Sequence, residues 1–299
     1  MSILVIGSVA LDKIKTPYGE SNETLGGSAT YFSTSAVNFC PVNLVAVVGE
    51  DFPKKHIQLL KDRNIGLEGL TVQKGKTFRW EGEYGCDFCD AKTIATHLNV
   101  FAQFNPVVPD TYLNNKYVFL ANIDPEIQLK VLKQMNKPKL VACDTMNYWI
   151  ESKRNHLMKV LKNVDIFFVN GSEAKQLTSE INLIKAGKEI LKFGPKVVVV
   201  KKGEHGVILF SKNDIFVTPA FLLESISDPT GAGDTFAGGF MGYLVKNRLF
   251  NKTNLRNAVI HGCVMATFAV EDFSPKRLTC IKITDITQRL NKFKKFTEF

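Results

Sequence analysis

The residues best suited to chemistry lie at positions 228–236, where the sequence is DPTGAGDTF. Gly231, Ala232 and Gly233 are small enough for the backbone to approach a ligand closely. A helical run follows them, so free N–H groups and the positive end of the helix dipole favour an anion there. A bound phosphate would repel Asp234, so this carboxylate is best explained as the base that takes a proton from an attacking hydroxyl group. The structural alternative is an ordinary N-cap with Asp as the capping residue.

The whole string resembles the second signature of the ribokinase-like (PfkB) carbohydrate kinases, whose usual form is DTxGAGD, with Pro229 at its second position. The resemblance implies that Asp234 is the catalytic base and that the amides of residues 231–233 form the anion hole. It also implies that Asp228 binds a monovalent cation, K⁺, together with carbonyl groups of the loop 271–275.

Composition restricts the classes of protein to consider. The chain has 299 residues, of which 45% are hydrophobic, enough for the core of one large α/β domain. The net charge of +9 comes from scattered lysines without the basic and aromatic pattern of a nucleic-acid module. No signal peptide is recognisable and no apolar run reaches the roughly 20 residues of a membrane span. We therefore expect a cytoplasmic protein with neither nucleic-acid nor membrane partners.

Cysteine usage fits a reducing compartment. Cys143 and Cys263 lie in apolar runs and are expected to be buried thiols. Cys86 and Cys89 have the spacing of a metal or redox pair, but no second close pair completes a four-ligand zinc site.

The first 30 residues predict one side of a binding site. Residues 2–8 form an apolar run typical of a buried strand that delivers Asp12 to its carboxyl end. By the resemblance, Asp12 holds sugar hydroxyl groups, and Gly26 and Gly27, followed by Ser28, begin the first signature of the family. The family usually carries Asn about four residues later, where this chain has Thr30 and Tyr31. This departure leaves the fold prediction intact and the identity of the substrate open.

An alternating segment, residues 78–84, predicts a half-exposed strand, with residues 93–100 as its partner. Gly75, Lys76 and Thr77 precede it, but a P-loop would require Gly in place of Leu70 and a following helix. By the resemblance, residues 10–22 and 73–103 form a small sheet that covers the sugar and builds a homodimer. Its aromatic side chains could line the substrate site or pack the sheet against the core: Phe78, Trp80 and Tyr84.

From residue 116 onward, strand and helix patterns alternate, which predicts a parallel sheet with helices on both faces and ligands at the carboxyl ends of the strands. The expected fold is a single ribokinase-like domain, residues 1–299, with three layers in which helices flank a mostly parallel central sheet, plus a small β-sheet lid.

Further polar residues follow the predicted strands. By the resemblance, Asp124 contacts the sugar, although it could simply cap a helix. Asn170 and Glu173 match the Asn-x-x-Glu of the family, which is associated with Mg²⁺ and phosphate, while their spacing also fits a capping box. The resemblance further places ATP against a turn and a helix, through the residues Lys202, Gly203, Gly206 and His261.

These features predict an ATP-dependent kinase that phosphorylates a hydroxymethyl group of a sugar or nucleoside, with ATP, Mg²⁺ and K⁺ as cofactors. One alternative is a catalytically silent binding protein on the same fold. The intact Asp234 and anion hole disfavour it, since a binder gains nothing from that carboxylate. The other alternative is an ADP-dependent kinase, whose family members tend to be longer.

Overall fold

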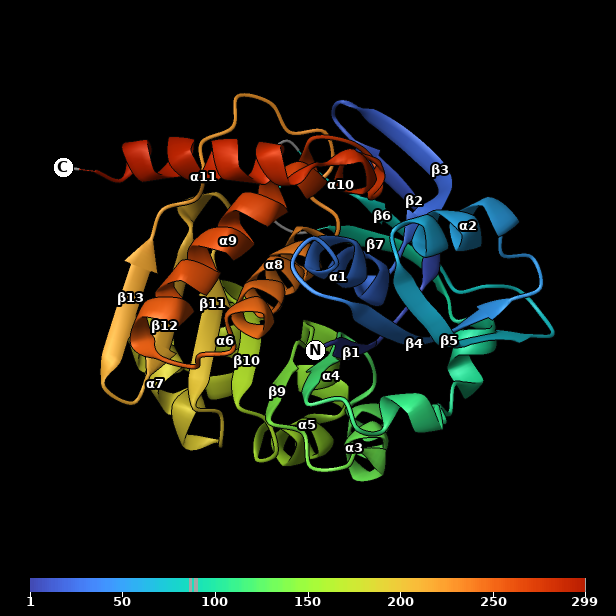
Figure 1. The fold of residues 1–299 in the computed structure, drawn as a ribbon, viewed down its shortest axis with the longest axis horizontal. Coiled ribbons are helices and arrows are strands. Elements are labelled where there is room, and N and C mark those ends of the chain that lie inside the picture. Colours follow the sequence, from blue (N-terminus) through green and yellow to red (C-terminus); the bar gives the residue numbers. More distant parts are fainter. Residues whose placement is uncertain (86–87, 89–90, 299) are drawn as a thin grey trace.

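The computed structural model describes residues 1–85, 88 and 91–298. Within these residues, the chain forms a sheet of nine strands and a separate sheet of four (Figure 1). The strands of the large sheet are β1 (Ile3–Ile6), β4 (Val42–Gly49), β5 (Ile65–Gln73), β8 (Tyr117–Leu120), β9 (Leu140–Cys143), β10 (Ile166–Asn170), β11 (Val197–Lys201), β12 (Val207–Ser211) and β13 (Asp214–Thr218).

The large sheet has the order β13-β12-β11-β10-β9-β8-β1-β4-β5. The strands from β11 to β5 run parallel, and β12 and β13 extend the sheet as an antiparallel hairpin. The inner strands are apolar throughout because both of their faces are covered. In β1, for example, Ile3 and Val5 belong to one core, and Leu4 and Ile6 belong to the other.

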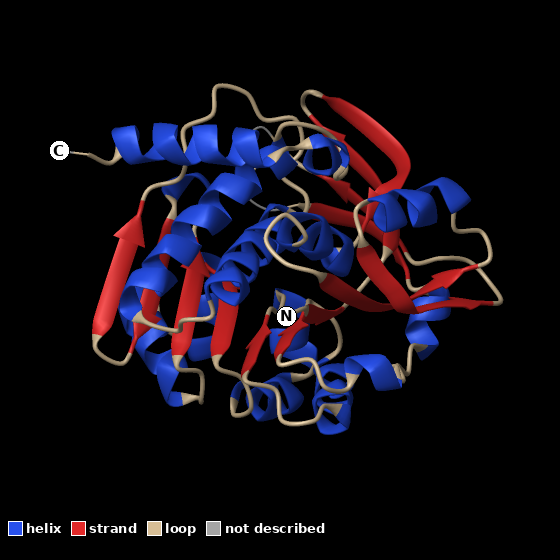
Figure 2. Cartoon of the chain, in the orientation of Figure 1, coloured by secondary structure: helices blue, strands red, loops and turns tan. Residues whose placement is uncertain are grey.

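Helices cover both faces of this sheet (Figure 2). The helices whose buried residues join the first core are α1 (Ser28–Ala36), α2 (Lys54–Asp62), α8 (Ala232–Asn247), α9 (Lys252–Val270), α10 (Lys276–Cys280) and α11 (Ile283–Phe296). Those that join the second core are α3 (Pro125–Gln134), α4 (Asn147–Ser152), α5 (Arg154–Leu161), α6 (Gly171–Thr178) and α7 (Leu183–Lys192).

The small sheet has the order β3-β2-β6-β7 and lies at the upper right of Figure 1. Its strands are β2 (Ala10–Thr16), β3 (Gly19–Gly26), β6 (Arg79–Glu83) and β7 (Lys92–His97). Side chains alternate along β2, so Asp12 and Ile14 are buried while Lys13 and Lys15 are exposed. The exposed lysines pair with Glu81 and Glu83 of β6. One face of the small sheet is therefore charged and the other is turned toward the protein.

The predicted three-layer α/β fold with a small additional sheet is confirmed. The element limits differ by a few residues; the strand expected over residues 93–100, for example, is β7 (Lys92–His97). Cys143 and Cys263 are buried as expected, whereas Cys86 and Cys89 lie outside the described residues. Among the described helices, none combines the length and the apolar character that a membrane crossing requires.

Candidate active site

The N-terminus of helix α8 lies at the residues predicted to form an anion site. The helix begins at Ala232, and its N-cap Gly231 has φ 73°, in the left-handed region that favours glycine. A Cβ atom on Gly231 would lie 2.3 Å from ring atoms of Tyr31 in α1. Both the backbone angle and the ring of Tyr31 therefore require glycine at this position.

Asp228 anchors the loop before the helix. Its Oδ1 accepts the N–H of Thr230 at 2.9 Å. Its Oδ2 is buried and has no hydrogen-bond partner among the described residues. Burial raises the pKa of Asp228. The carbonyl of Val270 accepts the N–H of Ser227 at 2.8 Å, which places the 271–275 loop next to this carboxylate. An orphaned carboxylate oxygen of this kind fits a bound cation.

Asp234 lies in the first turn of α8 and is half-buried. Burial and the charge of Asp144 raise its pKa to about 7, while the Lys201 ammonium opposes the shift. A carboxylate with a pKa near neutrality is suited to act as a general base, because it is partly deprotonated at physiological pH and accepts a proton readily.

Lys201 is a site residue that the sequence analysis did not identify. It ends β11, and its Nζ donates to Oδ2 of Asp144 at 2.7 Å. A Cβ atom on Gly233 would lie 2.9 Å from this Nζ, so the ammonium group lies against the anion hole. Burial alone would lower the pKa of Lys201, but neighbouring carboxylates, Asp144 first among them, outweigh burial and raise it. The side chain is thus a cation.

The sequence contained one signal for Lys201. A lysine that directly follows four buried valines has to find a charged partner or lose its proton. The partner, Asp144, is 57 residues away in the chain, so no local sequence pattern links it to Lys201.

The strand β2 and the twin glycines form the other side of the site. Asp12 is 4% exposed, and its carboxylate lies over Gly26, where a Cβ atom would come within 1.8 Å of Oδ2. Burial, followed by the charge of Asp228, raises the pKa of Asp12 to about 8. Ser28 is also buried and bonds to Ser8 and to the carbonyl of Asn122. The structure thus brings Asp12, Gly26 and Ser28 together.

Asn170 and Glu173 form the complete capping box that their spacing allows. Oδ1 of Asn170 accepts the N–H of Glu173, and Oε2 of Glu173 accepts the N–H of Asn170, both at 2.8 Å. This helix start lies at the carboxyl end of β10, next to the end of β11. The negative charge of Glu173 acts on the Lys201 ammonium group. The capping box and the N-terminus of α8 therefore both lie at the carboxyl ends of the strands.

The turn after β11 contains three of the residues that were predicted to contact ATP, Lys202, Gly203 and Gly206. The carbonyl of Gly206 accepts the N–H of Lys202 at 2.8 Å, which closes the turn, and Gly203 and Gly206 both have positive φ. Gly203 has no heavy atom within 4 Å of its hypothetical Cβ, so its surface is open to a ligand.

Two predicted residues have structural partners. Asp124 caps α3 by accepting the N–H of Glu126 at 2.9 Å, and its other oxygen lies 3.6 Å from Nζ of Lys153. The ring of His261 packs on Tyr243, with 4.1 Å between centroids. Tyr243 is ten residues beyond Gly233, about 15 Å along the helix axis. His261 therefore does not lie beside the N-terminus of α8, and its contact with ATP stays a prediction.

The small sheet reaches the loop before α8. Oγ1 of Thr230 donates to the hydroxyl of Tyr84 at 3.2 Å. Oγ1 of Thr16 donates to the carbonyl of Ser227 at 2.9 Å. Of the three aromatic residues in question, Tyr84 thus touches the site, whereas Phe78 stacks on Phe101 at 5.2 Å between centroids. Sequence patterns carried no signal for these contacts.

Together these groups can bind a polyanion and deprotonate a hydroxyl group beside it. Backbone amides at a helix N-terminus and a buried ammonium group favour phosphate. A carboxylate of raised pKa stands at the same helix terminus and can act as base. This combination of groups is suited to phosphoryl transfer.

The chain as a whole is similar to known proteins. The model for the pfkB family of carbohydrate kinases matches residues 2–279. A cytidine kinase from Thermococcus kodakarensis is 32% identical over 248 residues, which cover 81% of this chain and 87% of the relative. A nucleoside kinase from Methanocaldococcus jannaschii is 28% identical over 286 residues, or 90% of each chain. The crystal structure of a Methanocaldococcus jannaschii nucleoside kinase superimposes with a TM-score of 0.78, at 21% identity and with 97% and 98% of the two chains covered.

Proposed function

The chain belongs to the pfkB family of carbohydrate kinases, and on this basis we propose that it transfers the γ-phosphoryl group of ATP to the hydroxymethyl group of a nucleoside. The observation that carries the proposal is Asp234, which stands with a pKa near 7 at the anion-binding N-terminus of α8. Nucleosides are preferred to simple sugars as acceptors because two relatives are a cytidine kinase and a nucleoside kinase.

In the proposed reaction, Asp234 accepts the proton of the hydroxymethyl group as its oxygen attacks the γ-phosphorus. The bond between the γ-phosphorus and the bridging oxygen breaks, and ADP leaves with that oxygen. The proton then passes from the Asp234 carboxyl group to water. The amides of residues 231–233 stabilise the charge on the phosphoryl oxygens during the transfer.

The small sheet is proposed to act as a lid over the acceptor. Asp12 and Trp80 are register partners in β2 and β6 and so share one face of this sheet. A carboxyl group at this place can hydrogen-bond to the hydroxyl groups of a ribose, and an indole ring can stack on a flat base. This pairing of side chains supports a nucleoside acceptor.

On the donor side, ATP is proposed to lie along the turn after β11, in contact with Lys202, Gly203 and Gly206. Asn170 and Glu173 would hold Mg²⁺, largely through water, because Mg²⁺ gives up its water reluctantly. Bound Mg²⁺ would offset charge on the phosphates. K⁺ is proposed to bind the buried Oδ2 of Asp228, which has no hydrogen-bond partner in the described part of the chain.

The chain is also proposed to form a homodimer through the small sheet. Strand β7 is an edge strand of that sheet, and its Ile94 is 53% exposed. Unpaired edge strands tend to find a partner. Light scattering on the wild type and on Ile94→Asp tests this, with a dimer expected for the first and a monomer for the second.

The function is tested by measuring ADP release from MgATP with a panel of nucleosides and sugars, with cytidine as the first acceptor. We expect release that depends on one nucleoside class and increases with K⁺. ATP binding without release for any acceptor would instead support the catalytically silent binder. AMP release from ADP, without ADP release from ATP, would support the ADP-dependent alternative.

A further inference from the structure

Lys201 combines two properties that are costly to maintain together: its ammonium group is charged and largely buried. The side chain is 17% exposed, against 33–72% for the other described lysines that pair with acids. A buried cation needs compensation, and Asp144, itself 3% exposed, provides one hydrogen bond at 2.7 Å.

The ammonium group has unused donors. A lysine carries three N–H donors. One of them bonds to Asp144, and no other acceptor for this Nζ is found among the described residues. The Nζ atom that carries them lies 2.9 Å from the place of a Cβ on Gly233, the last residue of the proposed anion hole. Glycine at 233 thus leaves room for the ammonium group to reach the anion.

The surrounding charge shows what these donors can bind. The edge of the sheet gathers several carboxylates, among them Asp144, Glu173 and Asp234, which act on Lys201. A γ-phosphoryl group that arrives there meets repulsion from these carboxylates. The amides of the anion hole offer only partial positive charge. A full positive charge at the anion hole, fixed before the ligand arrives, offsets this repulsion most strongly in the transition state.

We propose that Lys201 is a catalytic residue whose ammonium group contacts the transferring γ-phosphoryl group, and that Asp144 is the positioning residue that holds it. Lys201 exchanges no proton in this role; it stays an ammonium ion while the phosphoryl group passes from ADP to the acceptor oxygen. The inference rests on the proposed use of ATP as donor.

A lysine that contacts the γ-phosphoryl group should distinguish ATP from ADP, and binding measures this without any acceptor. We expect Lys201→Met to bind MgATP about ten- to hundredfold more weakly than the wild type, with little change for MgADP, as measured by calorimetry. Lys196→Met is the matched control. Lys196 precedes the same strand and pairs with Asp165 at the same 2.7 Å, but its side chain is 72% exposed. It should leave both affinities unchanged.

Turnover gives the second readout. With an acceptor found for the wild type, Lys201→Met should lower kcat roughly 10²–10³-fold, the usual effect of removing one preorganised donor. Asp144→Asn keeps the lysine and should lower both kcat and the preference for ATP over ADP by a smaller factor. This variant, together with Lys201→Arg, keeps the inference testable if Lys201→Met does not fold.

Equal preference for ATP in the wild type and in the Lys201 variants would overturn the inference and leave the proposed kinase intact. A wild type that binds neither nucleotide would overturn both. A structural role alone would lower the unfolding temperature of Lys201→Met without changing the ratio of the two affinities, and that result would also reject a contact with the phosphoryl group.

Discussion

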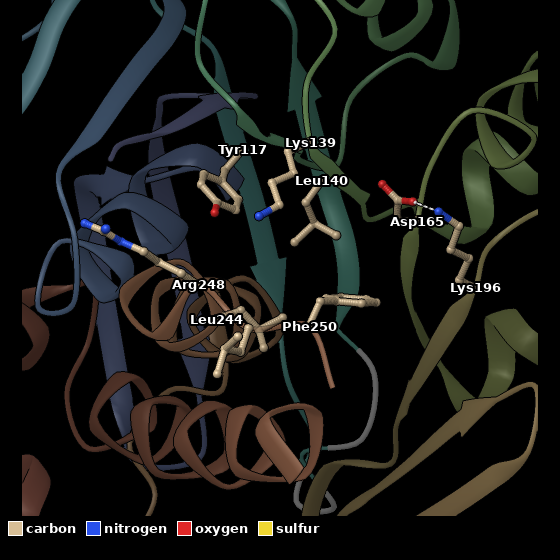
Figure 3. Close-up of a pocket in the computed structure, with 9 residues that line it drawn as sticks. Tyr117, Lys139, Leu140, Asp165, Lys196, Leu244, Arg248 and Phe250 are labelled. Atoms are coloured by element: carbon tan, nitrogen blue, oxygen red, sulfur yellow. Dashed lines mark hydrogen bonds and ion pairs between the residues drawn. The ribbon is translucent and has the colours of Figure 1, made fainter. Parts of the chain in front are cut away.

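The two ends of strand β11 carry the same kind of ion pair in opposite surroundings. At its carboxyl end, Lys201 and Asp144 lie 2.7 Å apart and are nearly buried, whereas just before its amino end Lys196 and Asp165 lie at the same distance near the surface. Figure 3 shows the second pair beside a pocket of about 110 Å³, which lies at the amino ends of the central strands. The pocket is also lined by Tyr117, Lys139, Leu140, Leu244, Arg248, Leu249 and Phe250.

The carboxyl ends and the amino ends of the parallel strands differ in the groups that they bring together. Parallel strands bring Asp144, Asn170 and Lys201 to one edge, where helix N-termini also point. The opposite edge receives helix C-termini, including that of α8, which ends near Arg248. The first edge offers buried charges and free amides, while the second offers solvated pairs and apolar side chains. We therefore expect substitutions at the first edge to affect turnover and those at the second to affect only stability.

The strongest test of this difference is Asp234→Asn. The amide keeps the shape but cannot accept the hydroxyl proton, so kcat should fall by roughly 10²–10⁴, the usual contribution of a positioned base. The measurement is steady-state turnover, with ATP binding checked by thermal shift. Near-full turnover in a folded variant that binds ATP would remove Asp234 from the role of base.

Gly231→Ala should produce the next largest effect. A Cβ atom meets the Tyr31 ring at 2.3 Å, and a residue with φ 73° is strained by about 1–2 kcal/mol. Because the amide of an anion-hole residue moves, kcat should fall by roughly 10²-fold. Turnover is compared with the unfolding temperature. Loss of stability with unchanged kcat would mean that this loop does not hold the phosphoryl group.

The pH dependence follows from the raised pKa of Asp234, about 7. Below that pH the carboxyl group is protonated and cannot act as base, and above it the carboxylate is available. At saturating MgATP, kcat/KM for the acceptor should therefore fall about tenfold per unit below pH 7 and level off above it. The profile is measured between pH 5.5 and 8.5. A profile that stays flat across pH 7 would contradict the assignment.

Tyr84→Phe removes the hydroxyl group that joins the small sheet to Thr230. One hydrogen bond corresponds to about a three- to tenfold change in rate, so kcat should fall by that factor. Tyr18→Phe is the matched control, because Tyr18 lies in the turn between β2 and β3 of the same sheet, is 71% exposed and stacks on Phe88. Equal turnover in both variants would show that the contact of the small sheet does not support the loop.

Lys196→Met should produce the smallest effect. The pair with Asp165 is surface-exposed, so its loss should change the free energy of unfolding by at most about 1 kcal/mol. Urea unfolding measures this, and kcat should equal that of the wild type. A large fall in kcat would mean that the amino ends of the strands also affect turnover, which would contradict the proposed difference between the two ends.

Local patterns predicted much of this site. Glycines before a helical run predicted the N-terminus at Ala232, and the spacing of Asn170 and Glu173 predicted their capping box. Such features depend on neighbours within a few residues, which a sequence displays directly.

The features that the sequence analysis missed depend on contacts across the chain. The hydrogen bond between Lys201 and Asp144 joins residues 57 positions apart in the sequence, and the one between Tyr84 and Thr230 joins residues 146 positions apart. Only the sheet order brings these pairs together. The contact of His261 with ATP stays a prediction, because an apolar helix pattern does not tell which turn of α9 faces a nucleotide and which packs on Tyr243.

The most direct test of phosphoryl transfer at the carboxyl edge is ³¹P nuclear magnetic resonance of the products from MgATP and the preferred nucleoside. We predict one equivalent of ADP and one phosphate ester on the hydroxymethyl oxygen, both absent with Asp234→Asn. ADP accompanied by inorganic phosphate, or an ester on a secondary hydroxyl group, would contradict the proposed reaction.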